Sequence, residues 1–215
     1  MTTNIYNHRI PDSTHDEYTI TFYHEPIHTL VTATPSLVDA WISQIESIHQ
    51  HRLNRLIVGL DIEWRPPNAP QIVNPVATLQ LCVGRRCLIF QIVHAEYFPY
   101  SLWNFLNNPL YTFMGVGIGD DVAKLRRDYN IGVASYAELG RLAAEQLGAP
   151  ELNRSSLKDL ARRVLGADIE KPTSIRRSNW DDQYLTDPQV KYACIDAFLG
   201  FEIARNLIQG FDNYN

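Results

Sequence analysis

The sequence predicts an α/β protein in which a mixed β-sheet is flanked by helices. Two pairs of short segments rich in β-branched residues, each pair joined by a turn, predict two hairpins in the first half of the chain. After residue 100 the pattern changes to one strand followed mainly by helical periodicity. Hydrophobic residues make up 45% of the 215 residues and charged residues 20%, which is enough apolar surface to form one core. Successive strands followed by strand–helix units are typical of a mixed sheet covered by helices.

The N-terminal half is expected to begin without regular structure. Residues 1–17 are polar and aperiodic and predict a flexible N-terminus, whereas 18–215 predict a single domain. The elements that follow are a hairpin over 18–24 and 27–34, a helix over 35–49, a buried strand over 55–63, a second hairpin over 76–83 and 87–92, and a helix over 100–107.

The C-terminal half is expected to be mostly helical. The sequence predicts a strand over 111–118 and then helices over 120–129, 136–147, 156–165 and 188–208. Ser156 and Asp159 have the spacing of a capping box and mark the start of one of these helices.

Charge and composition exclude several classes of protein. The net charge of −5 argues against binding nucleic acid by a strongly cationic surface alone. No apolar run has the roughly 20 residues needed to cross a bilayer, and no secretory signal is recognised at the N-terminus. The three cysteines, Cys82, Cys87 and Cys194, are too few and too scattered for a disulfide framework. We therefore expect a soluble protein of the cytoplasm, the nucleus or both.

Two acidic patterns lie at the ends of predicted strands. Asp61 and Glu63 end the most apolar strand, and residues two apart on a strand share one face. Asp120 and Asp121 follow the glycine-rich end of the next strand; we expect Asp120 to cap the helix and Asp121 to face inward. Each pattern alone also fits an ordinary strand end or helix cap.

A third pattern lies in the last predicted helix. Tyr192 and Asp196 are four residues apart and so share one helix face, among mostly apolar neighbours. An aspartate in such surroundings usually needs a partner or a metal ion, although a solvated position also fits.

The order and spacing of these three patterns resemble the DEDDy subgroup of the DnaQ-like 3′–5′ exonucleases, whose fold is RNase H-like. Within that family, the sequence is most similar to Werner-type exonuclease domains and their stand-alone plant relatives. The resemblance spans roughly residues 55–208. It is found in VGLDIEWRP (58–66), ATLQLC (77–82), VGI (116–118), SLKDLA (156–161), SNW (178–180), LT (185–186) and YACID (192–196).

The resemblance implies a metal-dependent 3′–5′ exonuclease that releases nucleoside 5′-monophosphates from the 3′ end of DNA or RNA. Four carboxylates would hold two ions, Mg²⁺ or Mn²⁺: Asp61 would bridge both, Glu63 and Asp196 would complete one site, and Asp121 would support the other. Tyr192 would orient the attacking water. The third carboxylate stays uncertain by one residue, between Asp120 and Asp121.

Positive charge gathers between residues 154 and 177, where seven Lys and Arg stand against three Asp and Glu. Lys171, Arg176 and Arg177 precede the predicted catalytic helix and are candidates for contacts with phosphates. Trp64 is a candidate for packing beside the terminal nucleotide, and ordinary core packing is an equal alternative.

A rival interpretation is a catalytically inactive exonuclease fold that binds nucleic acid or protein, although no implied metal ligand is missing. No membrane partner is expected, and the N-terminal hairpin leaves room for pairing with a second copy of the chain.

Overall fold

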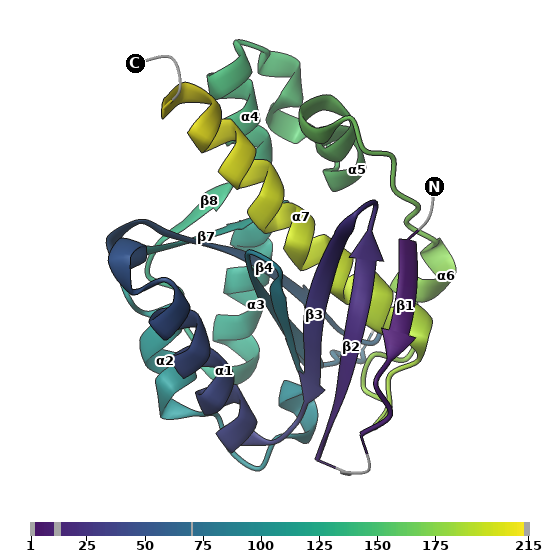
Figure 1. Cartoon of the computed structure of the whole chain (residues 1–215). Helices are drawn as coiled ribbons and strands as arrows, with labels where there is room; N and C mark the ends of the chain where they lie inside the picture. The colour runs from purple at the N-terminus through teal and green to yellow at the C-terminus, as the bar shows by residue number, and fades with distance from the viewer. Residues whose placement is uncertain (1–2, 11–13, 70, 213–215) are drawn as a thin grey trace.

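The computed structural model describes residues 3–10, 14–69 and 71–212, with side chains as far as residue 208. Its centre is one eight-stranded mixed sheet with the strand order β1-β2-β3-β6-β5-β4-β7-β8. Helices lie on both faces of this sheet (Figure 1). The predicted fold class is confirmed.

The strands fall into three groups. An N-terminal antiparallel group contains β1 (Thr3–Asn7), β2 (His15–Phe22) and β3 (Glu25–Thr32). The central group contains β4 (Leu56–Glu63), β5 (Thr78–Val83) and β6 (Arg86–Phe90), with β5 antiparallel to both neighbours. β7 (Tyr111–Gly115) and β8 (Tyr136–Glu138) extend the sheet in parallel to β4.

The longer helices are α1 (Pro35–Ile48), α2 (Tyr100–Leu106), α3 (Ile118–Tyr129), α4 (Leu139–Leu147) and α7 (Asp187–Asp212). Short helical segments connect them: η1 (Gln50–Arg55), η2 (Ile92–His94), η3 (Pro150–Arg154), α5 (Leu157–Leu160), the π-helical turn η4 (Ala161–Leu165) and α6 (Thr173–Arg176). No helix in the described ranges is both long enough and apolar enough to span a membrane.

Two hydrophobic clusters cover the two faces of the sheet. One joins α4 and α7 to the sheet, and the fully buried Trp180 belongs to it. The other joins α1, α2 and α3 to the opposite face and includes Val58, Leu60 and Ile62 of β4. Because side chains alternate along a strand, Asp61 and Glu63 point to the face that α7 covers.

α7 crosses β4 at unusually close range because glycines lie at the crossing. A Cβ atom added to Gly59 would lie 1.9 Å from the Ala197 carbonyl oxygen, and one added to Gly200 would lie 2.9 Å from the Met114 carbonyl oxygen. The backbones can therefore approach closely only because these positions lack side chains. The crossing sets Asp196 on α7 beside Asp61 on β4.

Several local predictions differ from the structure. Thr3–Asn7, inside the stretch expected to be irregular, forms edge strand β1 paired with β2. The helix expected over 136–147 starts only at Leu139, because Tyr136–Glu138 pairs with β7 as β8. The helix expected over 156–165 is interrupted by the π-helical turn η4 after one α-helical turn. Its predicted cap is present: the Asp159 backbone N–H donates to Ser156 Oγ at 3.2 Å.

Candidate active site

Three of the predicted carboxylates meet at the carboxyl end of β4. Asp61, Glu63 and Asp196 each offer an oxygen atom, and these oxygens lie within 4.8 Å of one another. Glu63 and Asp196 are buried, and Asp61 is partly buried with its Oδ2 inaccessible and without a hydrogen-bond partner. Hard, converging oxygen donors of this kind fit a divalent cation such as Mg²⁺ or Mn²⁺.

Lys171 supplies positive charge to this cluster from the segment before α6. Its Nζ lies 2.5 Å from Asp196 Oδ2 and 5.1 Å from the centre of the Tyr192 ring. The Lys171 side chain is 29% exposed and that of Asp196 is 6% exposed, so the pair is shielded from solvent on the carboxylate side. Buried charges of this density require such compensation.

Burial and mutual repulsion raise the pKa values of the clustered carboxyl groups. Burial raises the pKa of Asp61 well above its usual value, and the charges of Asp196 and Asp121 raise it further. The pKa of Glu63 rises to about 10 through burial and then through Asp61. For Asp196 burial raises the pKa, while Lys171 opposes that rise. The cluster therefore favours protonation, or a bound cation that replaces the protons.

The two neighbouring aspartates at the start of α3 have different surroundings. Asp120 is exposed, whereas Asp121 is partly buried and its pKa rises to about 7 through burial, Asp120 and Glu138. The charge of Asp121 reaches both Asp61 and Glu63. Asp121 is thus the inward-facing one, as expected. Asp120 is not the cap, because α3 begins one turn earlier: its N-cap is Gly117, whose N–H donates to both Glu138 carboxylate oxygens at 3.0 and 2.9 Å.

Tyr192 is fixed from two sides. The Trp180 ring packs against it at a centroid distance of 6.1 Å, and the Lys171 ammonium lies over its ring. Trp180 is itself held by an Nε1–H bond of 3.2 Å to the Arg176 carbonyl oxygen. Burial and then Asp196 raise the pKa of the Tyr192 phenol. The hydroxyl therefore stays protonated and is available as a donor.

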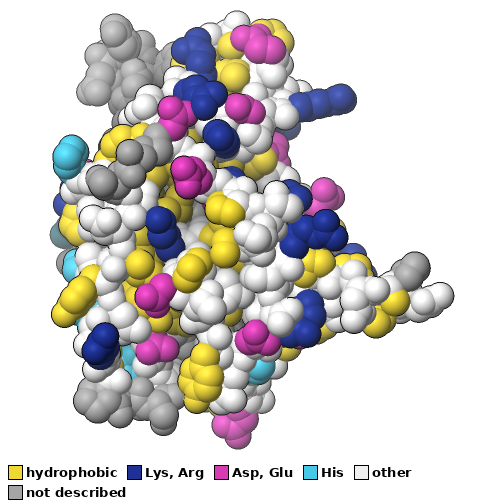
Figure 2. All heavy atoms as spheres, turned by 90° about the vertical axis from the view of Figure 1, so that its right-hand side faces the viewer, with side chains coloured by type: hydrophobic (Ala, Val, Ile, Leu, Met, Phe, Trp, Pro, Cys, Tyr) yellow, Lys and Arg dark blue, Asp and Glu magenta, His cyan; other side chains and the backbone are white. Residues whose placement is uncertain are grey.

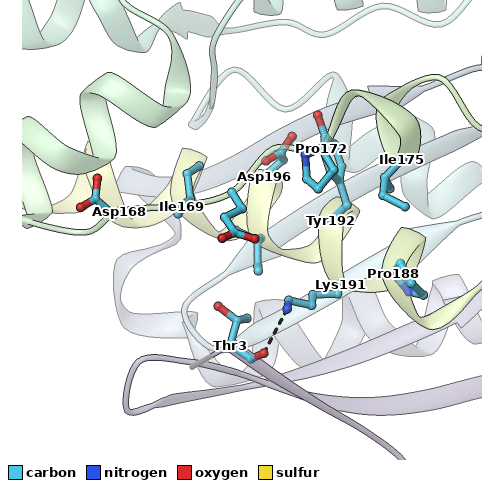
Figure 3. Close-up of a pocket in the computed structure, with 11 residues that line it drawn as sticks. Thr3, Asp168, Ile169, Pro172, Ile175, Pro188, Lys191, Tyr192 and Asp196 are labelled. Carbon is cyan, nitrogen blue, oxygen red and sulfur yellow. Dashed lines mark hydrogen bonds between the residues drawn. The ribbon is translucent and has the colours of Figure 1, made fainter. Parts of the chain in front are cut away.

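Two cavities share Tyr192 and Asp196. The larger, of about 370 Å³, opens onto Asp61 and is lined by three basic side chains, those of Lys158, Lys171 and Arg176. The smaller, of about 200 Å³, lies between α7, the segment before α6 and the N-terminal strand. In Figure 3, Tyr192 and Asp196 point toward the loop that bears Pro172, while Lys191 points to the opposite side and donates to the Thr3 carbonyl oxygen at 3.0 Å.

The predicted nucleic-acid contacts divide into two groups. Lys171 and Arg176 line the larger cavity, whereas Arg177 is exposed and is not one of the described residues that line it. Trp64 packs against the cluster on the opposite face of the sheet, with the Lys124 ammonium 4.9 Å from its ring centre, which favours core packing over packing beside a nucleotide. On the face shown in Figure 2, positive and negative side chains are interspersed and form no single basic field among the residues drawn in colour.

Two polar residues of the site escaped the sequence analysis as candidates. Lys158 lines the larger cavity because its helix follows the Ser156 cap directly. Gln80 is fully buried on β5 and pairs in the ladder with Asp61. Since the strand register brings Gln80 to Asp61, no local sequence pattern could identify it.

Sequence comparison agrees with this geometry. Residues 32–210 match the family model described as 3′–5′ exonuclease. The chain belongs to the 3′–5′ exonuclease family. It is 40% identical over 152 residues to the mouse bifunctional 3′–5′ exonuclease/ATP-dependent helicase WRN, covering 70% of this chain and 11% of that protein. It is 32% identical over 152 residues to an Arabidopsis thaliana 3′–5′ exonuclease, covering 70% and 52%.

A longer match extends toward both ends of the chain. Human exonuclease 3′–5′ domain-containing protein 2 is 32% identical over 211 residues, covering 91% of this chain and 33% of that protein. The chain therefore spans between about a tenth and a half of the length of these relatives.

Two solved structures share the fold. Escherichia coli RNase D matches with a TM-score of 0.67 at 18% identity, over 85% of this chain and 45% of that one. The Aedes aegypti Nibbler EXO domain matches with a TM-score of 0.65 at 16% identity, over 86% and 89%. The architecture is RNase H-like, as the sequence resemblance implied.

Proposed function

We propose that this protein is a metal-dependent 3′–5′ exonuclease that hydrolyses phosphodiester bonds of DNA or RNA and releases nucleoside 5′-monophosphates. The observation that supports this most directly is the convergence of Asp61, Glu63 and Asp196 oxygens within 4.8 Å in a member of this family. Asp121 lies close enough for its charge to act on Asp61. The three converging carboxylates and the nearby Asp121 support the proposal.

Asp61, Glu63, Asp121 and Asp196 would hold two divalent ions, which would activate the attacking water and stabilise the charge on the leaving 3′-oxygen. The protein's own groups do the rest. Tyr192, kept protonated, would donate a hydrogen bond that orients the water. Lys158 and Arg176 would hold the phosphates of the 3′-terminal nucleotides in the larger cavity.

The adjacent aspartates give a matched test of this proposal. The substrates are 5′-labelled 3′-recessed DNA and single-stranded RNA, incubated with Mg²⁺, Mn²⁺ or EDTA. The wild-type protein should shorten at least one of them from the 3′ end in a metal-dependent ladder. Asp61→Ala and Asp121→Asn should lower the rate at least about 10³-fold, because each removes a cation ligand.

Asp120→Asn is the control, since it changes the charge one residue away on the exposed side of the same helix and should keep nearly full activity. Full activity of Asp61→Ala would refute the proposal. Metal binding without cleavage of either polymer would point to a different substrate, whereas the absence of both cleavage and metal binding would favour the binding-module alternative.

A further inference from the structure

Gln80 is a fully buried polar side chain beside the carboxylate cluster. In the antiparallel ladder of β4 and β5, Gln80 lies directly opposite Asp61, and Thr78 lies directly opposite Glu63. Directly opposed residues point to the same face of a sheet, with Cβ atoms about 4.5–5.5 Å apart. The Gln80 carboxamide therefore lies on the face of the sheet that holds the Asp61 carboxylate.

Each residue of this ladder pair has one buried acceptor without a partner. Asp61 Oδ2 and Gln80 Oε1 are both buried without a hydrogen-bond partner, and the described residues contain just one other such side-chain atom. A buried polar atom without a partner costs about 1–3 kcal/mol. An ionised Asp61 carboxylate and the Gln80 carbonyl oxygen are both acceptors and cannot satisfy each other, whereas exchanging the oxygen and nitrogen of the Gln80 amide would turn an N–H donor toward this ladder partner.

The contact made by the Gln80 amide nitrogen also favours exchanging the oxygen and nitrogen atoms of this amide. Gln80 Nε2 lies 2.5 Å from Thr78 Oγ1. This separation is shorter than the usual range of about 2.7–3.2 Å for N–H···O bonds and lies within the range of about 2.5–3.0 Å for O–H···O bonds. The position next to Thr78 therefore suits an oxygen atom that accepts from the Thr78 hydroxyl. A half-turn of the amide exchanges its oxygen and nitrogen atoms.

We propose that Gln80 is a positioning residue for Asp61: the Thr78 hydroxyl donates to Gln80 Oε1, and the Gln80 amide N–H donates to Asp61 Oδ2. This chain of two hydrogen bonds fixes the plane of the Asp61 carboxylate and leaves its remaining lone pairs free for a cation. Partners of this kind orient the ligands of metal sites, and losing one costs about 10- to 100-fold in metal affinity or activity. The inference rests on the proposed function in one respect, that Asp61 binds the metal.

The test measures Mn²⁺ affinity from the decrease of the free-ion signal in electron paramagnetic resonance. Thermal unfolding of each variant in EDTA verifies that it is folded. Gln80→Met keeps the size of the side chain but removes the donor, and should weaken Mn²⁺ binding about 10-fold or more. Thr78→Val should weaken it less, and the double variant should be no weaker than Gln80→Met alone, because both act through one chain of bonds. Thr29→Val is the matched control: it removes a buried hydroxyl on the same sheet face that bonds to Cys194 Sγ, not to a carboxylate.

Gln80→Glu separates positioning from direct ligation. As a positioning residue, Gln80 needs its N–H, so Glu in its place should also weaken Mn²⁺ binding. Binding by Gln80→Glu as tight as that of the wild-type protein would make the side-chain oxygen a ligand and overturn the assignment.

Unchanged affinity in folded Gln80→Met would overturn it as well. Should that variant fail to fold, unchanged affinity in Thr78→Val would do so. A wild-type protein that binds no Mn²⁺ would instead refute the proposed function, and the assignment with it.

Discussion

Three carboxyl groups lie close together in the site, those of Asp61, Glu63 and Asp196. Of the described residues, Lys171 alone forms an ion pair with them. Packing of a core does not require this arrangement, since apolar residues of similar volume would avoid the desolvation of the charges. The raised pKa values of these carboxyl groups favour protons on some of them in the metal-free protein. A bound cation would replace these protons.

At the residue scale, this predicts that the metal-free protein loses stability as the pH rises from 6.5 to 8. In the folded protein the pKa of Asp121 rises to about 7 and that of Glu63 to about 10, whereas both groups have pKa values of about 4 in the unfolded chain. The folded state thus binds more protons than the unfolded state across this range, and its stability falls with pH. His49, whose pKa is lowered by burial and nearby arginines, is neutral in both states above about pH 7 and contributes little.

Urea unfolding in EDTA at several pH values measures this slope. Glu63→Gln should make the decrease of stability with pH shallower, because a glutamine at this position has no titratable proton to release on unfolding. In Mn²⁺ the slope should reverse, since the deprotonated carboxylates bind the ion. A stability in EDTA that rises between pH 6.5 and 8 would contradict the assignment of protons to this cluster.

At the scale of elements, the crossing of α7 over β4 joins the two halves of the site. Asp61 and Asp196 are far apart in the sequence, and each is fixed by its own element: strand alternation directs Asp61, and helix geometry sets Asp196 one turn after Tyr192. The distance between the elements depends on Gly59, whose missing side chain gives room to the Ala197 carbonyl oxygen.

Gly59→Ala should therefore damage both the fold and the site. The added methyl group would require α7 to move away from β4, at a cost of about 1–3 kcal/mol or more in the free energy of unfolding. Mn²⁺ affinity should fall in the same variant, because Asp196 moves with α7. Gly119→Ala is the control: it lies within α3 with open space around it and should be neutral or slightly stabilising. If Gly59→Ala kept the stability and the metal affinity of the wild-type protein, the site would not depend on the close approach of α7 to β4.

Local periodicity explains which elements the sequence could predict. β4 and α7 were predictable because a nearly continuous apolar strand and a long apolar helix have strong patterns of their own. β1 was missed because it is an edge strand in which Ile5 alone packs against the core. β8 was missed because three residues show no period, and their pairing with β7 is non-local. The roles of Gln80 and Lys171 depend on strand register and on the path of the chain before α6, neither of which leaves a local pattern in the sequence.

For the whole molecule, the net charge of −5 must be reconciled with the polyanionic substrate that we propose. The positive charge is concentrated in the larger cavity, where Lys158, Lys171 and Arg176 lie near the carboxylates. Over the face shown in Figure 2, charges of both signs are interspersed. A protein of this kind should hold the last few nucleotides and have little attraction for the rest of the strand.

The salt dependence of kcat/KM on a single-stranded substrate tests this distribution of charge. The two phosphate contacts proposed for Lys158 and Arg176 predict a slope of about −1.4 in a plot of log kcat/KM against log salt concentration, since each contact contributes about −0.7 on single strands. Lys158→Gln should reduce the magnitude of the slope by about 0.7. Arg141→Gln, on the exposed side of α4 where Arg141 pairs with Glu145, should leave the slope unchanged. A much steeper slope, or an equal effect of the two variants, would mean that the substrate is attracted by the surface as a whole and not by the cavity.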